Sequence, residues 1–197
     1  MDKQDKIVVF AGIIILIIST IGIIHHEKTY VTTEEVKKTS YTVSWIEKSN
    51  ELTDSGFVTK NEEWGKEYTL EAKNGVIYEI EIILEWDDNL DFHGLIFPWN
   101  WTDLIEANVN IEEFDFSQSQ QGYNRIEIKA NMEKPNDFKM EAKNESEVWN
   151  VIKEKERSQV NCKVNLTIYP KPRFFDRGND IKLHIIYHYC IPEIKAS

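Results

Sequence analysis

Two patterns of hydrophobic and polar positions divide the chain. Residues 7–24, IVVFAGIIILIISTIGII, form an apolar run without a charged residue. At a rise of about 1.5 Å per residue the run makes a helix of roughly 27 Å, close to the thickness of the hydrocarbon core of a bilayer. The pattern therefore predicts one transmembrane helix over 7–24, preceded by a short cytoplasmic tail over 1–6. A cleaved signal peptide is the alternative, although its apolar core is normally shorter.

Beyond residue 40, apolar and polar positions alternate, as they do in strands with one buried face. The alternation is clearest over 76–86, where three glutamates occupy one face and the other face carries Tyr78, Ile80, Ile82, Leu84 and Trp86. Strands with one wet face favour an antiparallel sheet. Further strands are predicted at 41–45, 56–60, 68–72, 125–132, 160–168 and 181–189, with turns at 51–55 and at Asn74-Gly75.

The remaining segments complete the predicted fold. Residues 145–157 fit either three helical turns or a strand, and we favour a strand. No long linker or internal repeat separates the strands. The sequence therefore predicts an all-β domain over 41–197, a single antiparallel β-sandwich of jelly-roll type. A juxtamembrane stalk over 25–40 is expected to join this domain to the transmembrane helix.

The charge balance excludes one class of partner. The chain carries 23 Lys and Arg residues against 34 Asp and Glu residues, a formal net charge of −11. Binding to nucleic acid needs clustered basic residues, which the sequence lacks, so no nucleic-acid partner is expected. The acidity is typical of a well-solvated surface. The expected partners are membrane lipid through residues 7–24 and a protein or glycan that the sequence does not identify.

The cysteines and the glycosylation triplets indicate an exterior location. Cys162 and Cys190 are the two cysteines of the chain, and because they lack metal-site spacing we expect a disulfide between them. In one simple hairpin their strands would set polar positions against apolar ones. Either a bulge shifts the register, or the strands are not neighbours and the bond crosses between sheets. N-glycosylation triplets begin at Asn100, Asn144 and Asn165.

An acidic segment follows the clearest strand and is a candidate metal site. Asp87, Asp88 and Asp91 lie within five residues of one another. Clustered carboxylates in a loop at a strand end suit calcium, but the spacing is not that of an EF-hand. An ordinary solvated turn is the alternative interpretation. Calcium is the one cofactor that the sequence offers.

An aromatic segment, FHGLIFPWNW over 92–101, is the candidate binding loop. Phe97, Trp99 and Trp101 surround a proline, and exposed aromatic loops contact sugars and protein partners. A core strand with an edge proline is the alternative. The sequence contains no nucleophile elbow, HExxH motif or Gly-rich phosphate loop. We therefore expect no enzymatic activity and name no catalytic residue.

Three segments carry a loose resemblance to a known type of protein: MDKQDKIVVFAGIIILIISTIGII, KEYTLEAKNGVIYEIEIILEWDD and VNCKVNLTIYP. The layout resembles archaeal single-pass surface proteins whose ectodomain is a β-sandwich like the pre-peptidase C-terminal domains. Those domains usually follow a catalytic domain, whereas none precedes the β-rich part here. The resemblance implies a fold and a location, and no activity.

These observations predict a non-catalytic, membrane-anchored module on the cell surface, with its C-terminal domain outside. It is expected to bind a protein, a glycan or an envelope component, or to have a structural role there. The alternative is an accessory subunit of a membrane protein complex, held through its single span and one sandwich face. A third hypothesis, a calcium-dependent enzyme or adhesin, depends on the acidic segment.

Overall fold

The computed structural model describes residues 9–10, 12–21, 23, 38–60, 62–87, 103–170 and 177–196. The chain divides into two compact units, Met1–Lys38 and Thr39–Ser197. In the first unit every described residue between 9 and 23 is helical. The large apolar side chains of this helix are 46 to 69% exposed. Among the described residues, no helix combines the length and the apolar character needed to cross a bilayer.

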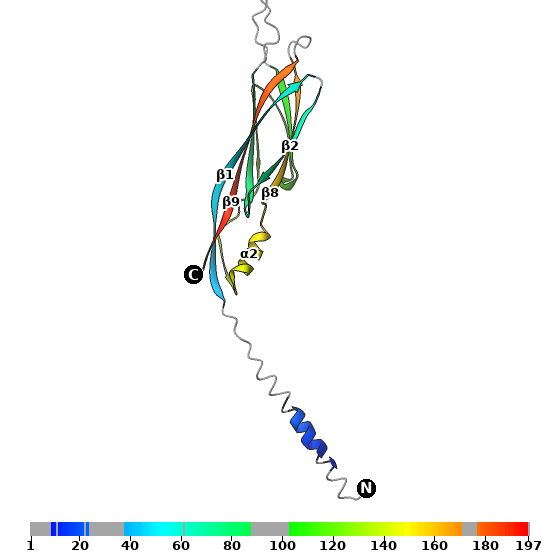
Figure 1. Cartoon of the computed structure of the whole chain (residues 1–197), viewed down its shortest axis with the longest axis vertical. Helices are drawn as coiled ribbons and strands as arrows, with labels where there is room; N and C mark the ends of the chain where they lie inside the picture. Colours follow the sequence, from blue (N-terminus) through cyan, green and yellow to red (C-terminus); the bar gives the residue numbers. More distant parts are fainter. Residues whose placement is uncertain are drawn as a thin grey trace, which may run out of the picture. The chain divides into compact units, whose positions relative to one another are not determined.

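The second unit consists mainly of strands in two antiparallel sheets, which confirms the predicted all-β class (Figure 1). The elements are β1 (Thr39–Thr59), β2 (Trp64–Glu71), β3 (Val76–Trp86), β4 (Leu104–Ile111), η1 (Glu112–Phe114), β5 (Phe116–Tyr123), β6 (Arg125–Asn131), β7 (Phe138–Ala142), α2 (Glu145–Lys153), β8 (Gln159–Tyr169) and β9 (Gly178–Ala196). The five-stranded sheet has the order β6-β3-β9-β1-β7, and the four-stranded sheet has the order β2-β8-β4-β5.

The main core fills the space between the two sheets. Alternate side chains of β3, β4, β6, β8 and β9 meet there, and most are less than 4% exposed. The largest buried side chains are Leu70, Ile77, Ile80, Leu84, Ile105, Ile111, Ile126, Ile128, Leu166, Ile181, Leu183 and Ile185. Burial of a Leu or Ile side chain stabilises the fold by about 1.5–3 kcal/mol, so this alternation is the main force that holds the sheets together.

One predicted turn is wrong, because β1 continues through it. Residues 51–55 were expected to separate two short strands. Instead β1 pairs with β9 without interruption, from Tyr41 opposite Ala196 to Thr59 opposite Gly178. Each residue of 51–55 is paired with a residue of β9, so the polar side chains of this stretch do not end the strand.

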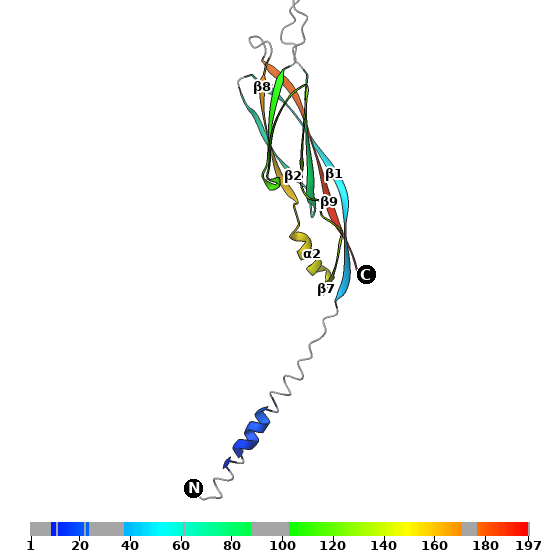
Figure 2. The ribbon, with the colours of Figure 1, turned by 180° about the vertical axis from the view of Figure 1, so that it is seen from behind.

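A second, smaller cluster lies on the other face of the β1–β9 ribbon. On β9, odd-numbered residues such as Leu183 and Ile185 belong to the main core, whereas Cys190 belongs to the second cluster. The register of β9 with β1 is unbroken, so side chains one position apart point to opposite faces. The second cluster also contains Val148 and Ile152 of α2, which lies beside the first half of β1 (Figures 1 and 2).

This arrangement corrects the predicted disulfide. Cys162 on β8 lies in the main core, and Cys190 lies in the second cluster. Both are buried free thiols, and no bond joins them. Of the two alternatives, the strands are not neighbours, since β8 and β9 belong to different sheets, but the structure has no bond that crosses between the sheets. The bond does not form because the two side chains lie in separate clusters.

Within the segment 145–157, residues Glu145–Lys153 form a helix rather than the favoured strand. The Asn144 side chain accepts a hydrogen bond from the Glu147 backbone N–H at 3.1 Å, which caps the first turn. Val148 and Ile152, four residues apart, are both buried, so they form one apolar stripe along the helix. Helical spacing therefore outweighs the β-branched residues of this segment.

The connection before β3 also differs from expectation. The Asn74-Gly75 turn is present, with a left-handed Asn74 at φ 56°, but it joins strands of different sheets rather than a hairpin. The pairing of β3 with β9 shifts at Tyr78, which is a bulge between Ile77 and Glu79. Tyr78 therefore packs against the second cluster and not against the main core, contrary to the predicted face.

Candidate functional site

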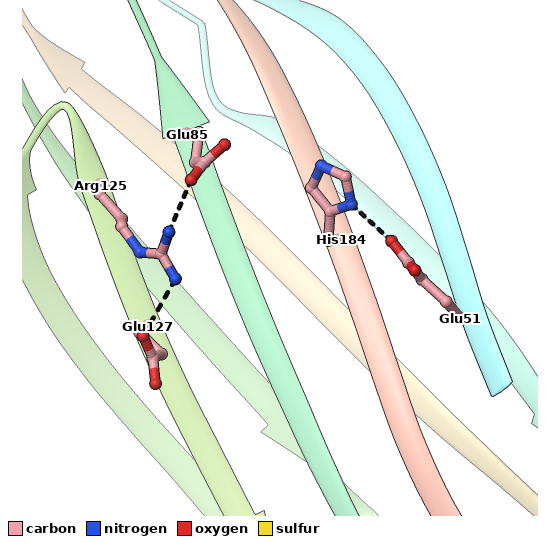
Figure 3. A network of polar contacts seen from close by, with 5 residues as sticks. All are labelled: Glu51, Glu85, Arg125, Glu127 and His184. Carbon is pink, nitrogen blue, oxygen red and sulfur yellow. Dashed lines mark hydrogen bonds and ion pairs between the residues drawn. The ribbon is translucent and has the colours of Figure 1, made fainter. Parts of the chain in front are cut away.

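The outer face of the five-stranded sheet is covered with paired charges. Figure 3 shows Arg125 of β6 between Glu85 at 2.7 Å and Glu127 at 3.2 Å, and His184 of β9 beside Glu51 at 2.7 Å. The Glu51 carboxylate accepts a hydrogen bond from the His184 ring, which lowers the pKa of Glu51. These contacts contain three carboxylates and one arginine, and the His184 ring is charged only when it is protonated, so the charges of this face are paired but acids outnumber bases.

One end of this face is hollowed. A hollow of about 770 Å³ is lined by Ser55, Gly56, Glu85, Trp86, Asp87, Asn124, Arg125, Asp180, Ile181 and Lys182. Its lining mixes both signs of charge, and Asp87 is the one predicted calcium ligand among the described residues. Asp88 and Asp91 lie outside them, and no three potential ligands of a metal ion cluster in the described part of the chain. The calcium site remains a prediction.

A buried polar pair holds the sandwich near this hollow. Asp103 and Asn179 are fully buried, and the Asn179 amide donates to the Asp103 carboxylate at 3.0 Å. The indole N–H of Trp86 donates to the backbone carbonyl of Asp103 at 3.2 Å. These contacts fix the start of β4 against β3 and β9. Their burial indicates a structural role rather than contact with a ligand.

The outer face of the four-stranded sheet has a different chemistry. Register places Tyr123 of β5, Leu104 of β4 and Tyr169 of β8 in one row across the sheet. Tyr123 is 55% exposed and Tyr169 is 46% exposed. Two strand spacings separate them, about 10 Å between backbones. This row is therefore an exposed aromatic platform.

Glu106 occupies the centre of the next row. Its carboxylate accepts hydrogen bonds from Ser119 at 2.8 Å, Gln121 at 3.1 Å and the Tyr169 hydroxyl at 2.9 Å. These hydrogen bonds favour the ionised form, and they lower the pKa of Glu106. The same contact raises the pKa of Tyr169. Glu106 is thus a fixed carboxylate that is half-buried among neutral donors.

The third row consists of small and amide side chains. Register aligns Ser119, Asn108, Asn165 and Gly65 across the four strands. A Cβ at Gly65 would lie 2.7 Å from the Asn165 side-chain oxygen, so the glycine leaves room for this amide to lie over β2. We call these three rows the polar face, made of Tyr123, Leu104, Tyr169, Gln121, Glu106, Thr167, Ser119, Asn108, Asn165 and Gly65.

The predicted glycosylation and loop residues have separate positions. Asn165 lies in the polar face and is half-buried, whereas Asn144 is exposed and caps α2. Asn100 lies outside the described residues, as does the candidate binding loop with its Phe97, Trp99 and Trp101. The structure brings none of the described candidates together into one site.

The two thiols are unsuited to reaction with a substrate. Burial raises the pKa of Cys162 to about 12, and burial also raises the pKa of Cys190. A thiol with a raised pKa is protonated at neutral pH, and the thiolate is the nucleophile. Neither cysteine therefore contributes a nucleophile to the described surface.

The polar face was not anticipated from the sequence, although a signal for part of it exists. Residues 104–111, LIEANVNI, alternate apolar and polar positions, and this pattern predicts a half-buried strand. Residues 116–123 give a weaker signal, because β5 is an edge strand whose alternate positions are nearly all polar. The pairing that assembles Glu106 with Gln121 and Tyr169 spans three strands and is not visible in any one of them.

Comparison with known proteins gives no assignment for this chain. No protein-family model matches the sequence, and no curated protein matches it significantly.

Proposed function

We propose that the protein is a non-catalytic, membrane-anchored binding module of the cell surface. The observation that carries the proposal is the exposed apolar helix at the start of the chain. Its described side chains include Phe10 and Leu16, each 69% exposed, and such a surface is unfavourable in water. A lipid environment would cover it.

Two hydroxyl groups support a lipid environment for this helix. Ser19 donates to the Ile15 carbonyl at 2.8 Å, and Thr20 donates to the Leu16 carbonyl at 2.5 Å. Polar side chains in a bilayer need internal partners, because no water is available there. Together with the uncharged run over 7–24, these contacts support a single transmembrane helix. The glycosylation triplets at Asn144 and Asn165 support an exterior position of the β-rich domain.

The strand order supports a jelly-roll ectodomain. Without the edge strand β7, the sheets have the orders β6-β3-β9-β1 and β2-β8-β4-β5. Eight strands in two four-stranded sheets of this order correspond to two Greek keys, as in jelly rolls. Such a sandwich presents two broad sheet faces that a ligand can contact.

Cell fractionation tests the anchor. The full chain is expressed, and membranes are washed with alkaline carbonate before detergent extraction; we expect the protein in the detergent fraction alone. The double substitution Ile15→Lys with Leu16→Lys should release it, since a central Lys costs about 2.5–3.5 kcal/mol of insertion. Ile46→Lys, at an exposed isoleucine of β1, is the matched control and should leave the protein in the membrane. Recovery of the wild-type chain in the soluble fraction would contradict the proposal.

Protease access tests the orientation. Protease added to intact cells should digest the β-rich domain of the wild-type chain, while an N-terminal tag stays protected until the cells are lysed. Digestion of the tag in intact cells, with protection of the domain, would place the domain inside and overturn this part of the proposal.

A further inference from the structure

We propose that the polar face of the four-stranded sheet binds a neutral polysaccharide, with Tyr123 and Tyr169 as its stacking platform and Glu106 as its central hydrogen-bond acceptor. The inference rests on the proposed function and deepens it, because it names the class of ligand and the surface that binds it.

The aromatic row supplies the apolar half of sugar recognition. A pyranose ring has C–H faces that pack on an aromatic ring, and Tyr adds a hydroxyl that bonds to the sugar or to the protein. Tyr123 and Tyr169 flank Leu104 in one row. Both rings are about half-exposed on a folded surface, so part of each ring faces solvent. Their separation of about 10 Å is comparable with the length of a disaccharide.

The second and third rows supply the polar half. The Glu106 carboxylate accepts hydrogen bonds from the side chains of Ser119, Gln121 and Tyr169. The carboxylate is therefore already oriented before a ligand arrives. Preorganised groups lose less conformational entropy on binding. Thr167, Asn108 and Asn165 extend this array with hydroxyl and amide groups, which both donate and accept. Sugar hydroxyls also do both, so the surface complements them.

The charge of the face selects a neutral ligand. Glu106 is the single charged residue among these three rows, all of whose positions are described, and no Lys or Arg lies in them. An anionic polysaccharide would meet a carboxylate without a cation to balance it, and it would also meet a chain of net charge −11. A protein interface usually buries a more extended apolar centre than this face offers, since Leu104 is its one aliphatic side chain.

The opposite face provides a contrast within the same domain. Its charges are paired across β1, β3, β6 and β9, as Figure 3 shows. Phe57 of β1 is exposed there to 42%, with Asp180 opposite it in the register. The five-stranded sheet therefore has an exposed aromatic ring opposite a charged residue, which makes Phe57 a matched control.

Binding is measured on the full chain in a mild nonionic detergent, produced in a host without N-glycosylation so that Asn165 is unmodified. The probes are soluble β-1,4-glucan, β-1,3-glucan, xylan, α-mannan and galactan, with polygalacturonate as the anionic probe, tested by affinity electrophoresis and titration calorimetry. We expect at least one neutral polysaccharide to bind. Tyr123→Ala and Tyr169→Ala should each weaken that binding at least tenfold, and Phe57→Ala should leave it within twofold.

Two further variants separate stacking from the polar contacts. Glu106→Gln retains the shape and removes the charge, so it should weaken binding to the neutral polysaccharide by about threefold to tenfold. Tyr169→Phe retains the ring and loses the hydroxyl, so it should bind more tightly than Tyr169→Ala. Equal losses in both Tyr169 variants would assign the effect to the hydroxyl and overturn the stacking platform.

Footprinting of the wild-type chain tests the site without any substitution, so the result does not depend on whether a variant folds. With saturating polysaccharide, hydroxyl-radical oxidation of Tyr123 and Tyr169 should fall severalfold, while oxidation of Phe57 should stay unchanged. Absence of binding to every neutral probe, binding to polygalacturonate alone, or protection of Phe57 instead of the tyrosines would overturn the inference. Failure of the anchor appears in the fractionation experiment, so the two proposals can fail independently.

Discussion

Asp54 joins the two sheets at one side of the sandwich, and its loss should have a pH-dependent effect. It lies on β1, and its carboxylate accepts hydrogen bonds from Lys66 and the Tyr68 hydroxyl of β2, both at 2.7 Å. The Lys66 ammonium and then the Tyr68 hydroxyl lower the pKa of Asp54 from 3.8 to about 2. The perturbation that tests this contact is Asp54→Asn.

The magnitude follows from the pKa and the exposure. At about 1.36 kcal/mol per pKa unit, the lowered pKa corresponds to at most about 2.5 kcal/mol of stability. The Asp54 side chain is 27% exposed and that of Lys66 is 46% exposed, so solvent screening reduces the value to about 1 kcal/mol. Because the folded pKa is depressed, this stability is present above about pH 3.8 and is lost as the pH falls towards 2.

Urea unfolding of the full chain in mild detergent, followed by tryptophan fluorescence, measures the difference. Asp54→Asn should lower the free energy of unfolding by about 1 kcal/mol at pH 6, and the difference from wild type should disappear near pH 2. Glu85→Gln is the control, since the exposed pair of Glu85 with Arg125 should contribute less than about 0.5 kcal/mol. A wild-type advantage over Asp54→Asn of equal size at pH 6 and pH 2 would refute the reasoning.

Three further predictions concern single positions. Asn144→Ala should destabilise the fold by about 1 kcal/mol because it removes the α2 cap; Ser146→Ala, which destroys the same glycosylation triplet, should leave the unfolding curve nearly unchanged. Iodoacetamide should label Cys162 and Cys190 only on unfolding, since both thiols are buried with raised pKa values. Mass spectrometry measures the labelling, and rapid labelling in native buffer would contradict the prediction. Gly178→Ala should cost more than 2 kcal/mol in thermal unfolding, because Gly178 has φ 129° and its added Cβ would lie 1.9 Å from a β1 carbonyl oxygen; an unchanged melting temperature would exclude that clash.

The strands with one solvent-exposed face could be predicted because the alternation of apolar and polar residues is a local signal. Residues 76–86 show it, and β3 has the predicted bounds. The same signal misplaced Tyr78, because a bulge depends on how β3 pairs with β9 and not on β3 itself. The turn over 51–55 failed for a related reason. Its polar residues permit a turn, but the long ladder with β9 keeps them extended.

The disulfide and the helix show a second limit of sequence patterns. Cys162 occupies a buried position of an alternating strand, as predicted, but the cluster that surrounds Cys190 was not foreseen. That second cluster exists because α2 supplies Val148 and Ile152 to the free face of the ribbon. The predicted strand over 145–157 does not supply these two side chains to the ribbon. It therefore cannot explain why Cys190 is buried without a bond.

The polar face could not be predicted for a more general reason. In the sequence, Glu106, Tyr123 and Tyr169 are separated by 17 and 46 positions, and none of them belongs to a recognisable motif. They become neighbours because β8 lies beside β4 and β4 lies beside β5.

A core position is specified by its own alternation, whereas a binding face is specified by register across strands. The hydrophobic positions of β4 place the Glu106 side chain on the solvent-exposed face of the sheet, since its neighbours Ile105 and Ala107 are buried on the other face. A shift of one residue in the pairing of β4 would bury Glu106 and expose both neighbours, at a cost of several kcal/mol. The energetics of the core thus hold Glu106 between Gln121 and Tyr169. It follows that substitutions at Ile105 or Ala107 that preserve burial should preserve the geometry of the face, although neither residue touches it.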